Sequence, residues 1–117
     1  MKKILVVDDE EHIRLLFKEE LEEAGYTVTL AEDGERALIQ AADLDPDLVM
    51  LDIQMPGIEG IEVARRLKAK KRDLPIIFCT AYEDYKHEFG AWSSDAYIVK
   101  SSNLAELKAK IRELLGE

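Results

Sequence analysis

Residues 4–9 read Ile-Leu-Val-Val-Asp-Asp, a short apolar run that ends in two adjacent carboxylates. A run that is apolar throughout predicts a β-strand covered on both faces, as in a parallel sheet. Comparable runs follow at residues 26–30, 48–51, 76–79 and 97–99. The run at 26–30 alternates apolar and polar residues, which favours an edge strand. The chain is therefore expected to contain five strands.

Longer charged stretches with helical spacing separate these runs. They predict helices at residues 11–24, 33–42, 58–67, 84–91 and 103–115. Gly25 provides a stop after the first helix, Asp33-Gly34 opens the second, and Asn103 is a good N-cap for the last. Strands that alternate with helices indicate right-handed βαβ units and an α/β fold with a parallel sheet.

The size and composition of the chain restrict its function. Its 117 residues suit one domain spanning 1–117, and we expect it to stand alone. The net charge of −9 disfavours direct contact with nucleic acid. No apolar run approaches the roughly 20 residues that a membrane span needs, so membrane insertion is not expected. A single cysteine, Cys79, cannot form an internal disulfide and is typical of the cytoplasm.

Chemically active residue types follow four of the five apolar runs. Asp8 and Asp9 follow the first run, Asp52 the third, Thr80 the fourth and Lys100 the fifth. In an open parallel sheet the ligand site lies beyond the carboxyl ends of the strands, so these side chains are expected to meet at one edge. Three carboxylates, a hydroxyl and an ammonium group would then share one site.

The charges of that site call for a cation. Two carboxylates about 4 Å apart repel each other by roughly 4 kcal/mol at an effective dielectric constant near 20. Lys100 can offset one negative charge, and a hard divalent ion can offset the others. Mg²⁺ suits better than Ca²⁺, because a few carboxylates, waters and a phosphoryl oxygen complete its octahedron. One carboxylate could then attack a phosphoryl group and become an acyl phosphate.

These residues together resemble the receiver domain of two-component response regulators. The resemblance lies in Asp8-Asp9, in Asp52 within the sequence Leu-Asp-Ile-Gln-Met-Pro-Gly at 51–57, in Thr80-Ala81 and in Lys100, and it covers essentially the whole chain. It implies a flavodoxin-like, doubly wound sheet with strand order 2-1-3-4-5 and five helices. It also implies a signalling switch that catalyses its own phosphorylation and dephosphorylation but is not a dedicated enzyme.

The resemblance implies a metal site and a phosphoacceptor. Asp52 would be the nucleophile that takes a phosphoryl group from a phosphohistidine. Asp9, Asp52 and the backbone carbonyl of Gln54 would hold Mg²⁺, with Asp8 acting directly or through water.

The remaining residues of the pattern would bind the phosphoryl group and report its presence. Lys100 would pair with Asp52 and then with its phosphate. Thr80 and the backbone N–H of Ala81 would contact the phosphoryl oxygens, and Tyr97 would turn inward when Thr80 moves. Ser101 stands where the family usually has a proline, often after a cis bond. A non-proline cis bond costs about 2.5–4 kcal/mol, so we expect a trans Lys100–Ser101 bond.

The resemblance also implies partners. The phosphodonor would be a sensor histidine kinase or a phosphotransfer protein, and an unidentified downstream protein would read the fourth helix, fifth strand and fifth helix. Leu15 lies opposite the apolar stripe of the first helix, with Leu16 on its flank. Leu15 or Leu16 is expected to contribute to the contact with the phosphodonor, and a dimer that forms on phosphorylation is a further alternative.

Three other functions remain open. An aspartate-nucleophile phosphohydrolase needs an Asp-x-Asp pattern and usually a cap domain, whereas Asp8 and Asp9 are adjacent. A flavodoxin-like electron carrier holds its flavin phosphate in a Ser/Thr-rich loop, where this chain has Asp-Asp-Glu-Glu at 8–11. A receiver-like docking module would keep the fold without the phosphorylation.

Overall fold

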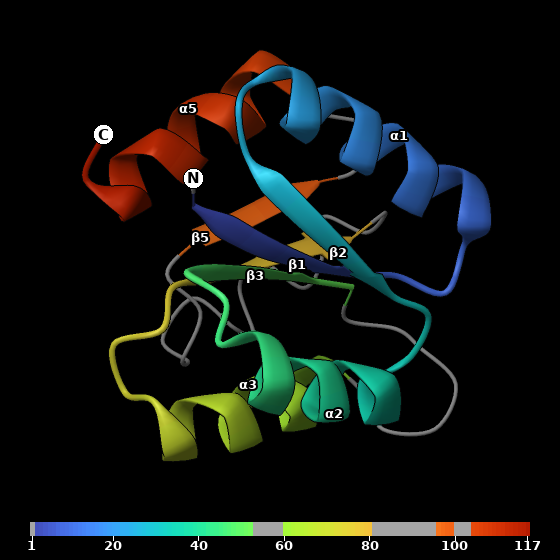
Figure 1. Ribbon diagram of the computed structural model, residues 1–117, viewed down its shortest axis with the longest axis vertical. Helices are drawn as coiled ribbons and strands as arrows, with labels where there is room; N and C mark the ends of the chain where they lie inside the picture. The colour runs from blue at the N-terminus through green and yellow to red at the C-terminus, as the bar shows by residue number, and fades with distance from the viewer. Residues whose placement is uncertain (1, 53–59, 81–95, 100–103) are drawn as a thin grey trace.

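The computed structural model describes residues 2–52, 60–80, 96–99 and 104–117, and strands alternate with helices over residues 3–80 (Figure 1). The elements are β1 (Lys3–Val7), α1 (Glu11–Glu23), β2 (Thr27–Ala31), α2 (Gly34–Leu44), β3 (Leu48–Leu51), α3 (Gly60–Lys70), β4 (Ile76–Thr80), β5 (Ala96–Val99) and α5 (Leu104–Leu115). The alternation confirms the predicted α/β fold. The helix predicted at 84–91 lies outside the described residues.

The five strands form one parallel sheet in the order β2-β1-β3-β4-β5. This is the order that the resemblance implied. β1 pairs with β2 on one side and with β3 on the other, so that Val7 lies opposite both Ala31 and Leu51. The strand order reverses between these neighbours, and a parallel sheet forms its ligand site at such a point.

Helices cover both faces of the sheet: α1 and α5 lie on one face, and α2 and α3 on the other (Figure 1). Alternate residues of β1 therefore enter two different cores. Ile4 and Val6 pack in the core that also contains residues of α1 and α5, whereas Leu5 and Val7 pack in the core beside α2 and α3. Burial on both faces explains why the first run is apolar throughout.

The predicted helix stops are present in the structure. Gly25 follows Ala24, the C-cap of α1, and adopts a φ of 101°, which glycine reaches without strain. Asp33 caps α2 by accepting a hydrogen bond from the backbone N–H of Arg36 at 2.8 Å. α3 ends at Lys70, and its last turn carries Lys68 and Lys70, cations that favour the negative end of the helix dipole. None of the helices in the described residues is long and apolar enough to cross a bilayer.

Tyr26 stands just before β2, one residue outside the strand that was predicted to start with it. The residue is 6% exposed, and its hydroxyl donates a 2.8 Å hydrogen bond to Glu117 Oε1. Burial and the hydrogen bond to Glu117 raise the pKa of Tyr26 from 10 to about 12. This side chain therefore links the start of β2 to the end of the chain after α5.

This raised pKa predicts that the protein loses stability as the pH rises from 10 to 12. The folded state holds the Tyr26 proton more tightly than the unfolded state, so its contribution is complete below pH 10 and is lost through pH 12. We expect a loss of about 1–2 kcal/mol in the free energy of unfolding, measured by urea denaturation. Tyr26→Phe removes the titrating group and should therefore remove this fall in the free energy of unfolding between pH 10 and pH 12. An equal fall in wild type and Tyr26→Phe would contradict the prediction.

Candidate functional site

Two buried carboxylates lie at the carboxyl edge of the sheet. Asp8 follows β1 and Asp52 follows β3, and the backbone N–H of Asp52 donates to the carbonyl of Val7 at 3.0 Å. The two residues are 2% and 5% exposed, and they are the only buried charged residues in the described part of the chain. Burying a carboxylate is costly unless it has partners. Two of them at adjacent strand ends therefore mark a candidate site.

The loop from β1 to α1 adds two exposed carboxylates. Oxygens of Asp8, Asp9 and Glu10 lie within 4.8 Å of one another. The backbone N–H of Glu10 donates to Asp8 Oδ1 at 2.9 Å, and Nη1 of Arg14 donates to the Asp8 carbonyl at 2.7 Å. These bonds fix the backbone and one carboxylate oxygen of Asp8. The exposed carboxylates of Asp9 and Glu10 lie beside it, and Glu10 Oε2 is 3.5 Å from Nε2 of His12.

This group of oxygens suits Mg²⁺. Mg²⁺ takes oxygen ligands and keeps several of its waters, so a site with one buried and two exposed carboxylates meets its needs. Glu10 was not among the residues that the sequence predicted for the metal. It stands at the N-cap of α1, but its side chain forms no capping bond there. Its position directly after Asp8-Asp9 was the only signal in the sequence.

β4 and β5 bring two further predicted residues to the sheet. Thr80 is the last residue of β4 and lies opposite Val99, while Tyr97 lies opposite Phe78. The end of β4 is thus at the same edge of the sheet as the ends of β1 and β3. The predictions for Gln54, Ala81, Lys100 and the Lys100–Ser101 bond fall on residues outside the described part. The individual roles of all these residues stay predictions.

The two leucines predicted to contact a partner are exposed on α1. Leu15 is 53% exposed and Leu16 is 42% exposed, whereas Phe17 and Leu21 of the same helix are buried against the sheet. Ile39 on α2 is 56% exposed and is the only other large apolar side chain so exposed in the described residues. The leucines are therefore available for contact, and Ile39 offers a matched comparison on the opposite layer.

Comparison with known proteins identifies a family. A family model described as the response regulator receiver domain matches residues 4–112. The response regulator TrrA from Thermotoga maritima, in a crystal structure with Mg²⁺-BeF, is 53% identical with a TM-score of 0.92, covering 97% of this chain and 99% of that one. A structure of TrrA in complex with the histidine kinase ThkA gives 53% identity and a TM-score of 0.90, with coverage of 98% and 99%.

Curated relatives include longer proteins. The alkaline phosphatase synthesis transcriptional regulatory protein PhoP of Bacillus subtilis is 41% identical over 116 residues, which cover 97% of this chain and 48% of PhoP. The response regulator MprA of Mycobacterium sp. is 40% identical over 115 residues, covering 97% of this chain and 50% of MprA. The chain thus spans about half the length of the curated relatives it matches.

Proposed function

This chain belongs to the response-regulator receiver domain family, and on that premise we propose that it is a phosphoacceptor switch of a two-component or phosphorelay system with Asp52 as the phosphoacceptor. The observation that carries the proposal is the pairing of two buried carboxylates, Asp8 and Asp52, at adjacent strand ends beside the exposed Asp9. The experiment that tests it is the intact mass of the protein after incubation with Mg²⁺ and a small acyl phosphate.

The reaction would be a displacement at phosphorus. A carboxylate oxygen of Asp52 attacks the phosphorus of a phosphohistidine, an O–P bond forms, and the P–N bond breaks with its electron pair left on the imidazole nitrogen. The product is an acyl phosphate on Asp52. Mg²⁺ would be held by Asp8, Asp9, Asp52 and the carbonyl of Gln54. When bound, it would supply positive charge that offsets the negative charge of the phosphoryl oxygens. The TrrA structure with Mg²⁺-BeF supports this choice of metal.

The buried position of Asp52 supports its role as the acceptor. The Asp52 backbone is hydrogen-bonded to the end of β1, which limits the directions that its carboxylate can take. Lys100 would balance the charge of Asp52, and Thr80 with the backbone N–H of Ala81 would bind the transferred group. Movement of Thr80 and Tyr97 would then pass the change to the surface. The family is not one of dedicated enzymes, so self-catalysed phosphorylation and dephosphorylation are part of the proposal.

We further propose a histidine kinase or a phosphotransfer protein as the donor and one domain over residues 1–117. The complex of TrrA with ThkA supports a kinase partner, and the family match over 4–112 supports the single domain. The surface formed around β5 and α5 would meet a downstream protein or a second copy after phosphorylation. We place these events in the cytoplasm, in keeping with a single cysteine, Cys79, that is buried and forms no disulfide.

The exposed leucines of α1 predict a specific loss of kinase transfer. Leu15→Ala and Leu16→Ala are each expected to slow transfer from the cognate kinase about tenfold, because each removes roughly half of a leucine's burial energy from the contact. Phosphorylation by a small acyl phosphate should keep its wild-type rate. Ile39→Ala on α2 is the matched control and should leave both rates unchanged. Equal slowing by Ile39→Ala would show that α1 is not the contact.

A further inference from the structure

A polar pocket lies next to the acidic site, at the carboxyl end of β2. Its volume is about 300 Å³, and it is lined by Arg14, Leu30, Ala31, Glu32, Arg36 and Gln40. Two hydrogen bonds join its wall to the acidic site: Arg14 Nη1 donates to the carbonyl of Asp8, and the backbone N–H of Asp8 donates to the carbonyl of Ala31. The pocket and the acidic site therefore share one piece of backbone.

Two arginines reach this pocket from different helices. Arg14 comes from α1 and Arg36 from α2, and neither forms a salt bridge within the described residues. Both stand within the first four residues of their helices, where the positive end of the helix dipole disfavours a cation. Neither an ion pair within the described residues nor the helix dipole therefore accounts for an arginine at these two positions.

Gln40 adds a further donor. It lines the pocket, and the Nε2 of its amide carries two N–H groups that can donate to an anion.

We propose that this pocket binds a small tetrahedral oxyanion of the phosphate class. Two guanidinium groups outweigh the single carboxylate of Glu32, and the positive ends of α1 and α2 add to their attraction. Donors from two helices suit an anion whose oxygens point in several directions, rather than the single plane of a carboxylate. Binding here requires no phosphorylation of Asp52. The inference thus stands independently of the proposed function.

The binding test uses the Asp52→Asn protein without Mg²⁺, so that neither a covalent adduct nor a metal–phosphate complex contributes. Inorganic phosphate and methyl phosphate are titrated separately at constant ionic strength, and amide shifts are followed by NMR. We expect saturable shifts at the pocket residues with at least one of the two ligands, and the ligand that binds shows whether the anion is free or carried on a small molecule. Arg36→Gln should weaken binding about tenfold, and Glu32→Gln should strengthen it.

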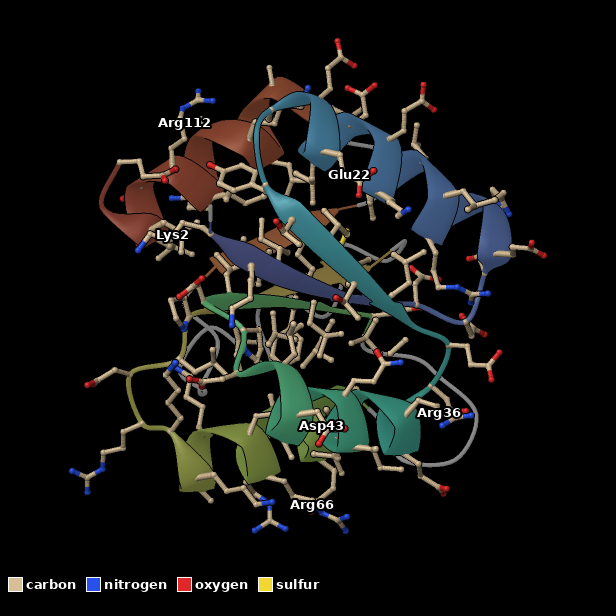
Figure 2. The ribbon with its side chains drawn as sticks, viewed as in Figure 1. Lys2, Glu22, Arg36, Asp43, Arg66 and Arg112 are labelled. Atoms are coloured by element: carbon tan, nitrogen blue, oxygen red, sulfur yellow. The ribbon has the colours of Figure 1, made fainter. Side chains whose placement is uncertain are left out.

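Arg112→Gln is the matched control for Arg36→Gln. Arg112 is an exposed arginine on α5, in the layer opposite to that of Arg36 (Figure 2), and its replacement should leave phosphate binding unchanged. Three outcomes would each overturn the proposal. They are a lack of saturation with both ligands, equal weakening by Arg112→Gln and Arg36→Gln, and, when acetate is titrated in the same way, binding of acetate as tight as that of phosphate.

Discussion

Replacing Asp52 by asparagine is expected to abolish phosphorylation of this protein. Wild type incubated with Mg²⁺ and a small acyl phosphate should gain the mass of one phosphoryl group, and Asp52→Asn should gain none. The amide has nearly the shape of the carboxylate but is a far weaker nucleophile. Asp52 is 5% exposed, so this similarity of shape preserves the packing around it. The substitution therefore removes the reacting group and leaves the sheet edge in place.

Two controls define the result for Asp52. Asp43→Asn changes an exposed aspartate on α2 (Figure 2) and should leave the adduct intact. Wild type incubated with the acyl phosphate in the presence of a chelator should form no adduct, because the clustered carboxylates then lack the charge that Mg²⁺ supplies. An adduct that persists in Asp52→Asn would assign the acceptor to another residue. If neither an acyl phosphate nor a cognate kinase labels wild type, the docking-module function takes the place of the phosphoacceptor.

Phe78→Ala is expected to cost about 3–5 kcal/mol in the free energy of unfolding. Phe78 is fully buried on β4, in the core between the sheet and the pair of helices α2 and α3. Removing its ring leaves a cavity that the neighbouring side chains can fill only in part. The loss is a large share of the roughly 5–15 kcal/mol that stabilises an ordinary domain.

Urea denaturation measures this loss as a lower midpoint with an unchanged slope. Leu15→Ala is the matched control, because it also shortens a large apolar side chain but at an exposed position. It should change the free energy of unfolding by no more than about 0.5 kcal/mol. A cost for Phe78→Ala as small as that of Leu15→Ala would contradict the burial on which the prediction rests.

Membership of the receiver family argues against two of the three alternative functions, but not against the third. It favours a receiver over an aspartate-nucleophile phosphohydrolase and over a flavodoxin-like electron carrier, because the family model covers residues 4–112. It does not separate a phosphorylated receiver from a docking module of the same fold. Ser101, which stands where the family usually has a proline, is the feature that keeps the docking module open. The Asp52 experiment makes that distinction directly.

The fold class could be predicted from the sequence because its signals are local. A four-residue apolar run is long enough to indicate a strand buried on both faces, and Gly25 and Asp33 mark helix ends through their own backbone and side-chain chemistry. The residues alone indicated a parallel sheet but not the order of its strands. That order came from the resemblance, and the pairing of β1 with both β2 and β3 confirms it.

Which residues share the site depends on contacts between segments that are distant in the sequence. The sequence placed Asp8 and Asp52 at strand ends, but only the pairing of β1 with β3 puts those ends side by side. Glu10 and Arg14 were missed because a charged residue early in a helix looks the same in sequence whether it faces solvent or a site. The pocket at the carboxyl end of β2, which Arg14 and Arg36 line, was missed for the same reason. Periodicity along one chain determines its elements, whereas the packing of elements against one another decides which side chains share a site.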